Sequence, residues 1–291
     1  MQFNESYFEV EPGIKIYVRD YFTNDPKAPA VLCLHGLTRN GQDFTAMIEQ
    51  LRQTATDAGP RFIVPDLRGR GLSQYDPDPS HYYPAHYVAD MWELLDDMHV
   101  SNFHIIGTSM GGIMAILMHH AKPRQVDGVL LNDIGPMVPL PGLAHILTYL
   151  GLDMEEDSWD AVLAAMKNRH HQDLPDFTES EWNAIAKRTY AQNEDGTWVQ
   201  AYDPLIRGPV EEAYAEGMEL DLWEAYSVIN KPLLLLRGEL SQLLPKALAE
   251  QMLSKNPDCK LVEIPRKGHV PQLDEPESIQ AILDWLALAP Q

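Results

Sequence analysis

The stretch Phe103–Gly112, FHIIGTSMGG, decides the fold of this chain. Its first four residues predict a short buried strand, and an apolar helical pattern follows directly at 110–120. Between the two lies a G-x-S-x-G motif at 107–111. In so tight a turn the residues beside Ser109 must be small, and the strained backbone lifts the hydroxyl above the sheet. The helix N-terminus favours developing negative charge there. We therefore predict that Ser109 is a nucleophile.

Strands and helices alternate on both sides of this turn. Short apolar runs that end at Gly, Pro or polar residues predict strands at 31–34, 62–64, 103–106, 128–131, 232–236 and 260–264. Amphipathic stretches predict helices at 42–54, 85–98, 110–120, 246–254 and 276–288. An N-terminal hairpin is expected from 7–10 and 15–19. This alternation predicts an α/β fold with a mostly parallel central sheet flanked by helices.

Residues 137–227 interrupt the alternation. The segment has a helical pattern, is rich in Trp and Tyr, and holds 18 acidic residues against 5 basic ones. It separates two strands of one sheet, and no flexible linker marks either border. We therefore expect a helical cap over the strand ends, inserted into a core made of 1–136 and 228–291.

Composition and charge narrow the classes of partner. The 291 residues are 45% hydrophobic and 22% charged, a globular balance. The net charge of −21 disfavours nucleic acid and anionic membranes. No apolar run approaches the roughly 18 to 20 residues that a membrane helix needs, and 1–12 lacks the features of a secretory signal. We expect a cytoplasmic protein with a small-molecule partner, and a homodimer is compatible with the sequence.

The two cysteines, Cys33 and Cys259, are too few for a disulfide framework or a metal cage. No metal cluster, phosphate loop or dinucleotide motif competes with the serine motif, so no metal and no cofactor is expected.

One of the eleven histidines suits a general base. His269 follows the last predicted strand in the loop Arg266–His269, from which an imidazole can reach Ser109. The adjacent pairs at 119–120 and 170–171 lie on helical stretches, where neighbouring side chains diverge by about 100° and cannot bind one ion together. We predict His269 as the base.

Six segments together resemble the α/β-hydrolase superfamily over nearly the whole chain. They are HGLTRN (35–40), PDLRGRGLS (65–73), GTSMGG (107–112), LNDIGP (131–136), LLLRGELS (234–241) and RKGHVPQLDEPE (266–277). The resemblance implies the fold and a Ser–His–acid triad. It also implies an oxyanion hole from the backbone N–H groups of Leu37 and Met110, with His35 holding the loop. Structural roles follow for Asp66, Arg68, Gly69 and Gly71.

The chain departs from the family at the acid of the triad. The family usually places it three or four residues after Gly238, but these positions hold Ser241 and Gln242, which carry no charge. Three alternatives remain, of which we favour the first. They are Asp133 at the end of the strand 128–131, Glu239 next to Gly238, and a neutral Gln242 or Ser241 orienting His269.

A serine nucleophile suits acyl transfer. The sequence therefore predicts a carboxylesterase-type serine hydrolase that cleaves small to medium esters through an acyl-enzyme. One alternative is a C–C bond hydrolase of meta-cleavage-type diketones, in which Arg39 would bind the substrate carboxylate. Cofactor-free oxygenation or perhydrolysis on the same triad is another. The last is a catalytically weak ligand-binding member of the fold.

Overall fold

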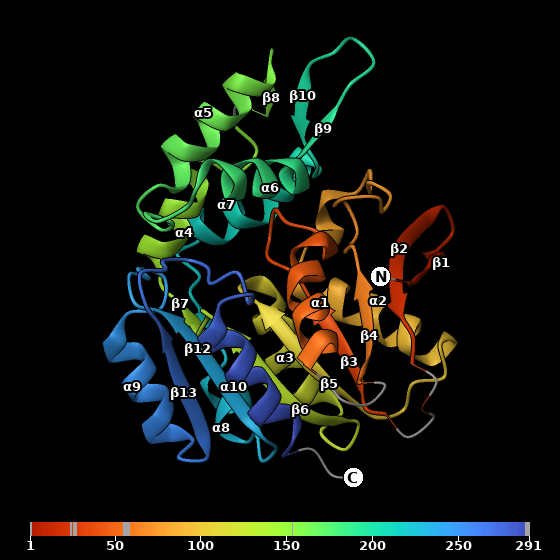
Figure 1. Ribbon diagram of the computed structural model, residues 1–291, viewed down its shortest axis with the longest axis vertical. Coiled ribbons are helices and arrows are strands. Elements are labelled where there is room, and N and C mark those ends of the chain that lie inside the picture. Colours follow the sequence, from red (N-terminus) through yellow and green to blue (C-terminus); the bar gives the residue numbers. More distant parts are fainter. Residues whose placement is uncertain (1, 24, 26–27, 55–58, 153, 289–291) are drawn as a thin grey trace.

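An eight-stranded sheet forms the centre of the computed structural model, which describes residues 2–23, 25, 28–54, 59–152 and 154–288 (Figure 1). The strand order is β1-β2-β4-β3-β5-β6-β12-β13. The N-terminal hairpin is antiparallel and pairs antiparallel with β4, and the remaining strands are parallel. The strand bounds are β1 Asn4–Glu11, β2 Ile14–Tyr21, β3 Ala30–Leu34, β4 Arg61–Pro65, β5 Phe103–Thr108, β6 Val126–Asn132, β12 Leu233–Gly238 and β13 Cys259–Ile264.

Helices cover both faces of this sheet. Alternate residues of β12 belong to different cores. Leu233 and Leu235 share one core with residues of α2, α3, α8 and α9, whereas Leu234 and Leu236 share the other with residues of α1 and α10. A strand buried on both faces reads as a continuous apolar run, which is why LLLL was recognisable in the sequence. The helix bounds are α1 Thr45–Thr54, α2 Pro84–Asp97, α3 Met110–Ala121, α8 Trp223–Ser227, α9 Lys246–Lys255 and α10 Pro276–Leu286. The mostly parallel α/β architecture predicted from the sequence is confirmed.

In the core, most differences from the predicted elements lie at their ends. The stretch predicted as one helix at 42–54 is divided into a short 3₁₀ helix, η1 (Gly41–Phe44), and α1. The side chain of Asn40 accepts a hydrogen bond from the Gln42 N–H and so starts the first turn. A second 3₁₀ helix, η2 (Pro79–His81), precedes α2. Hydrophobic periodicity sets the centre of an element, and local capping sets its end.

The segment 137–227, which we call the cap segment, is mainly helical. It lies above the carboxyl ends of the strands in Figure 1. A small core of its own joins α5 and α6, with Val162, Met166, Trp182 and Ile185 at its centre. Its elements are β7 Met137–Val138, α4 Leu140–Leu147, β8 Glu155–Glu156, α5 Trp159–His170, α6 Glu179–Thr189, β9 Tyr190–Gln192, β10 Trp198–Gln200, η3 Pro204–Ile206, α7 Arg207–Ala215 and β11 Leu220–Asp221.

The chain returns to the core before the end of the cap segment. Helix α8 packs beside α3 on a face of the main sheet, and the Tyr226 hydroxyl donates a 3.2 Å hydrogen bond to the Met252 carbonyl of α9. Residues 223–227 therefore pack with the sheet, although the sequence pattern grouped them with the insertion.

Two further observations concern the cysteines and the lengths of the helices. Cys33 and Cys259 are buried and unpaired, and burial raises the pKa of the Cys259 thiol to about 11. Every helix within the described residues is too short or too polar to cross a bilayer.

Candidate active site

Ser109 stands in the turn between β5 and α3. Its φ of +52° lies in the left-handed region, which side chains other than glycine rarely adopt. A Cβ on Gly107 would lie 2.3 Å from the Gly111 carbonyl oxygen, and one on Gly111 would lie 2.1 Å from the Leu34 oxygen. Only glycine fits two positions before and two positions after the serine, so close contacts explain both glycines of the motif. Backbone strain of this kind persists where surrounding structure enforces it.

His269 bridges Ser109 and Asp133. Its Nε2 lies 2.9 Å from Ser109 Oγ, and its Nδ1 lies 2.8 Å from Asp133 Oδ2. The three residues come from the ends of β5 and β6 and from the loop after β13. Both distances are within hydrogen-bonding range for a base that takes a proton from the serine hydroxyl. The structure thus brings together the predicted nucleophile, base and favoured acid.

Asp133 is completely buried at the end of β6, with a φ of +57°. Its Oδ1 accepts a 2.9 Å hydrogen bond from the Gly238 N–H, and its Oδ2 accepts a 2.7 Å bond from the Ser241 hydroxyl. With the imidazole, three donors converge on this carboxylate. Such bonds hold a buried carboxylate in one orientation and compensate for its lost hydration.

The other acid candidates lie elsewhere. Glu239 accepts a 2.7 Å hydrogen bond from the Arg266 N–H through its Oε2. Gln242 is exposed. Ser241 occupies the position at which the family pattern expects the acid, and it donates to Asp133. The residue in the usual place supports the carboxylate that lies against the imidazole.

The two residues predicted to supply the oxyanion donors, Leu37 and Met110, lie beside Ser109 in the fold or next to it in the chain. A Cβ on Gly36 would lie 3.7 Å from Ser109 Cβ, so the loop that contains Leu37 runs beside the serine. Across the part of the chain that is described, neither the Leu37 N–H nor the Met110 N–H donates to a protein acceptor. Both predicted oxyanion donors are thus available to a ligand oxygen.

His35 holds this loop and does not contact Ser109. Burial lowers its pKa to about 3, so the imidazole is neutral. Its Nδ1–H donates to the Gly36 carbonyl (2.8 Å) and its Nε2 accepts from the Leu67 N–H (2.9 Å). A protonated ring could not accept the second bond.

The cap segment contacts the His269 loop through Asp173, a residue that sequence reasoning missed. Its Oδ1 accepts a 3.2 Å hydrogen bond from the His269 N–H, and its carbonyl accepts a 2.6 Å bond from the Gly268 N–H. Nearby, Asp176 pairs with Arg266. No motif marks Asp173, because its role depends on a contact across 96 residues of sequence.

Arg39 joins the loop after β3 to the cap segment. Its guanidinium donates two hydrogen bonds to Asp43, at 2.8 and 2.6 Å, and a third to Thr189 at the end of α6. Asp43 also accepts a 3.1 Å bond from Arg188. A substrate carboxylate would have to compete with Asp43 for this arginine.

The sequence of this chain is similar to those of known hydrolases. The model of the Alpha/beta hydrolase family matches residues 31–280. The chain belongs to the alpha/beta hydrolase family. A 3-hydroxybutyrate-oligomer hydrolase from Cupriavidus necator is 31% identical over an alignment of 280 residues that covers 92% of this chain and 89% of the relative. A 2-(acetamidomethylene)succinate hydrolase from Mesorhizobium japonicum is 26% identical over 89% of this chain and 88% of the relative.

Solved structures agree with the family assignment. An alpha/beta hydrolase from Novosphingobium aromaticivorans is 34% identical, with a TM-score of 0.89 over 99% of both chains. In alpha/beta hydrolases the triad follows the chain order nucleophile, acid, histidine. Ser109, Asp133 and His269 stand in that order along this chain, and Asp133 directly follows β6.

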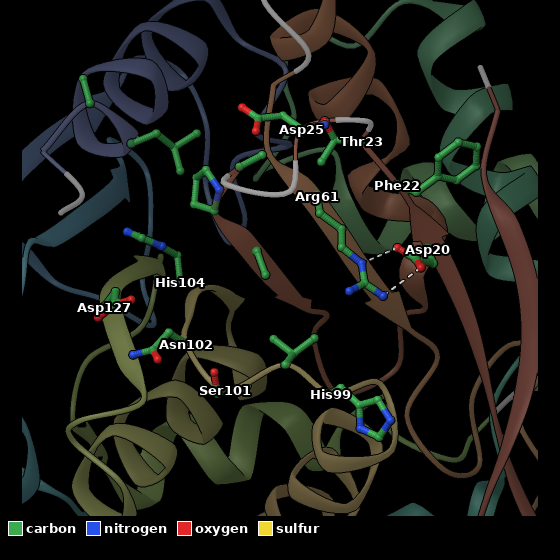
Figure 2. Close-up of a pocket in the computed structure, with 16 residues that line it drawn as sticks. Asp20, Phe22, Thr23, Asp25, Arg61, His99, Ser101, Asn102, His104 and Asp127 are labelled. Atoms are coloured by element: carbon green, nitrogen blue, oxygen red, sulfur yellow. Dashed lines mark hydrogen bonds and ion pairs between the residues drawn. The ribbon is translucent and has the colours of Figure 1, made fainter. Parts of the chain in front are cut away.

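A cavity of about 1050 Å³ lies away from these residues, at the amino ends of the parallel strands. Figure 2 shows its lining, in which Arg61 and Asp20 form an ion pair at 2.9 Å and His104 and Asp127 lie on the other side. Open α/β sheets bind ligands beyond the carboxyl ends of their strands. The candidate site at Ser109 has that placement and this cavity does not.

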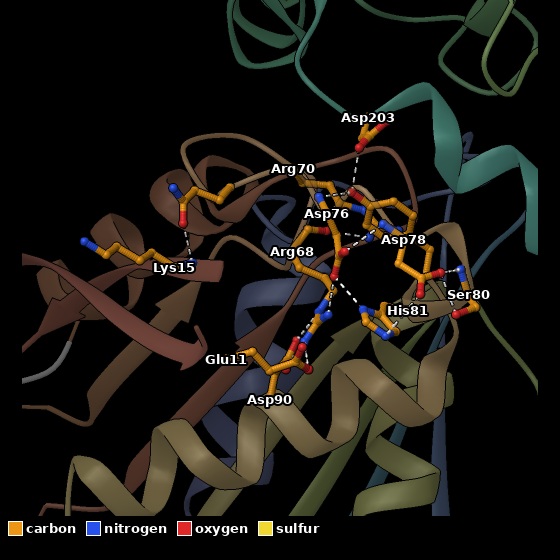
Figure 3. Close-up of polar contacts among 12 residues, drawn as sticks. Glu11, Lys15, Arg68, Arg70, Asp76, Asp78, Ser80, His81, Asp90 and Asp203 are labelled. Carbon is orange, nitrogen blue, oxygen red and sulfur yellow. Dashed lines mark hydrogen bonds and ion pairs between the residues drawn. The ribbon is translucent and has the colours of Figure 1, made fainter. Parts of the chain in front are cut away.

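Three ionisable residues with metal-ligand atoms, Glu11, Asp76 and His81, also converge, but around an arginine. Figure 3 shows Arg68 among the carboxylates: its guanidinium lies 3.0 Å from Glu11, 2.6 Å from Asp76 and 2.6 Å from Asp90. A fully buried guanidinium needs such compensation. The acidic residues of this cluster therefore neutralise the buried Arg68, which agrees with the structural role that the family resemblance implies for this arginine.

Proposed function

We propose that this alpha/beta hydrolase cleaves carboxylic esters through an acyl-enzyme on Ser109. The observation that carries the proposal is the hydrogen-bonded chain from Ser109 Oγ through the His269 imidazole to Asp133 Oδ2. Such an arrangement activates a hydroxyl that is otherwise a weak nucleophile.

The geometry supports a two-step reaction. Ser109 Oγ attacks the ester carbonyl while His269 Nε2 takes its proton, and Asp133 stabilises the imidazolium. The Leu37 and Met110 N–H groups donate to the tetrahedral oxyanion. When the C–O bond breaks, the alcohol leaves with the proton from His269. Water then attacks the acyl-enzyme while the same imidazole takes its proton. His269 returns this proton to Ser109 Oγ as the bond between that oxygen and the acyl carbon breaks and the acid leaves.

The relative from Cupriavidus necator suggests the class of ester. Its name states that it hydrolyses oligomers of 3-hydroxybutyrate, and such oligomers are joined by ester bonds. We propose esters of short hydroxy acids as substrates. The aromatic residues of the cap segment would bind the acyl and alcohol portions and exclude water.

The C–C bond hydrolase remains the second candidate. The relative from Mesorhizobium japonicum acts, by its name, on a substituted succinate, which carries two carboxylates. Arg39 is close to the site but is bonded to Asp43, so a carboxylate-bearing diketone would have to displace that contact. The arrangement therefore favours the ester over the diketone.

The test compares Ser109→Ala with Ser254→Ala, a control on α9 whose hydroxyl contacts only its own helix. Substrates are p-nitrophenyl butyrate, a 3-hydroxybutyrate dimer and a meta-cleavage-type diketone. We expect wild type and the control to cleave the two esters, and Ser109→Ala to lose at least about 10⁴-fold in kcat. Hydrolysis of the diketone alone would favour the second candidate. No turnover and no labelling of Ser109 by a fluorophosphonate would favour the binding protein.

A further inference from the structure

Arg70 contacts both of the residues that are predicted to supply the oxyanion donors, Leu37 through its backbone and Met110 through its side chain. Its Nε donates a 2.8 Å hydrogen bond to the Leu37 carbonyl, and its Nη2 lies 3.8 Å from Met110 Sδ. Its Nη1 donates to the Arg68 carbonyl at 2.7 Å. One buried side chain thus contacts both Leu37 and Met110. The family resemblance implied structural roles for four residues of this loop, Asp66, Arg68, Gly69 and Gly71, and none for Arg70.

The charge of Arg70 has no carboxylate partner within 4.0 Å among the described residues. Arg68, two positions earlier and also buried, has three (Figure 3). The Arg70 guanidinium instead lies over the rings of Tyr87 and Tyr82, at 4.6 and 5.6 Å from their centroids. The carboxylate of Asp203 accepts from the Tyr82 hydroxyl. Aromatic rings compensate a buried cation less than a carboxylate does.

We propose that Arg70 is a positioning residue for the oxyanion hole, a role that rests on the serine hydrolase proposed above. Its bond to the Leu37 carbonyl holds the peptide plane that follows Leu37, while His35 holds the Gly36 carbonyl in the plane that carries the Leu37 N–H. Arg70 thereby limits how far Leu37 and its N–H can move. Its positive charge, which no carboxylate within 4.0 Å among the described residues neutralises, adds to the field that stabilises an oxyanion at Ser109. Negative charge develops there only during the reaction, so the interaction favours the transition state over the bound ester.

Three substitutions separate charge from hydrogen bonding. Arg70→Lys keeps the charge but loses the planar fork, Arg70→Gln keeps one amide donor but loses the charge, and Arg70→Met loses both. Arg61→Met is the control, since Arg61 pairs with Asp20 at the opposite end of the sheet. Each variant is titrated with a fluorophosphonate to count functional sites, and thermal unfolding identifies variants that do not fold.

We expect Arg70→Met to lower kcat per titrated site by about 10- to 100-fold, less than loss of a direct donor, with KM within about threefold. Fluorophosphonate labelling of Ser109, which also forms a negatively polarised oxygen in the oxyanion hole, should slow by a similar factor. Arg70→Lys should retain more activity than Arg70→Gln. If Arg70→Met does not fold, the Lys and Gln variants carry the same comparison.

Two results would overturn the role of Arg70. One is wild-type kcat per titrated site in Arg70→Met, or equal values in Arg70→Lys and Arg70→Gln when Met does not fold. The other is full recovery of kcat in Arg70→Gln without recovery in Arg70→Lys, since that shows a structural hydrogen bond alone.

Failure of the proposed function would give a different result, because wild type itself would neither cleave esters nor be labelled. Labelling without ester turnover leaves the Arg70 comparison measurable through the labelling rates.

Discussion

The Ser241 hydroxyl donates a 2.7 Å hydrogen bond to Asp133 Oδ2, the same oxygen that lies 2.8 Å from His269 Nδ1. The position at which the family pattern expects the acid is therefore one hydrogen bond away from the carboxylate that contacts the imidazole. Two strand ends, those of β6 and β12, can supply a carboxylate to one histidine because they are neighbours in the sheet.

Replacing the carboxylate tests its role. Asp133→Asn should lower kcat by roughly 10³- to 10⁴-fold, because a neutral amide neither stabilises the imidazolium nor enforces the correct tautomer. Steady-state kinetics on p-nitrophenyl butyrate measure the loss. Asp133→Asn/Ser241→Asp should recover at least tenfold of it, since the new carboxylate starts from a position already in contact with Asp133. Wild-type kcat in Asp133→Asn would exclude Asp133 as the acid.

The close packing of the serine turn leads to a prediction about stability. Gly111→Ala would place a methyl group 2.1 Å from the Leu34 oxygen, a backbone atom that cannot move without distorting β3. We expect a loss of several kcal/mol in the free energy of unfolding, as in other overpacked sites, together with slower labelling of Ser109. Gly208→Ala is the control, because its methyl group meets nothing closer than 3.9 Å. Equal urea midpoints for the two variants would contradict the steric argument.

Much of the fold and of the site followed from local sequence patterns. The apolar run before Ser109 and the glycines around it express a steric requirement that is local, and local requirements leave local signals. His269 was found for a similar reason, since it follows the last strand directly. Asp133 was favoured because it stands at the carboxyl end of the strand predicted at 128–131, where some members of the family place their acid.

Residues that act across the fold left no such signal. Asp173 contacts His269 from the cap segment. Arg70 contacts Leu37 and Met110 from a loop in which the family resemblance implied only structural roles for other residues. The bond between Arg39 and Asp43 spans only four residues, yet its partners in α6 come from about 150 residues away. Such contacts depend on how segments meet, which periodicity does not encode.

The burial of His119 predicts that the free energy of unfolding depends on pH. His119 on α3 is 1% exposed, and its ring nitrogens bond to none of the described residues. Burial lowers the pKa of its imidazole below the ordinary value of 6.5, so below pH 6.5 the unfolded chain binds a proton that the folded chain does not. Stability from this residue is complete above pH 6.5 and is lost as the pH falls, by at most about 1.4 kcal/mol per pH unit.

The comparison needs two neighbouring variants. Urea unfolding at pH 7.5 and 5.5 should show a smaller loss of stability in His119→Gln than in wild type. His120→Gln, which alters the exposed neighbour, should behave as wild type does. The same pH dependence in all three proteins would show that His119 does not titrate as its burial implies.

The cap segment should affect catalysis through Asp173. The His269 N–H donates a 3.2 Å hydrogen bond to the Asp173 carboxylate. Asp173→Ala removes this acceptor and lets the imidazole move relative to Ser109. A shift of about 1 Å in a catalytic group lowers rates by up to roughly 10²-fold, so we expect kcat to fall by about 10- to 100-fold. Asp173→Asn keeps an acceptor oxygen and should lose less. Asp176→Ala, which removes only the exposed pair with Arg266, should retain wild-type kcat. Rates per fluorophosphonate-titrated site distinguish misplacement from unfolding. Wild-type kcat in Asp173→Ala would show that the core alone positions His269.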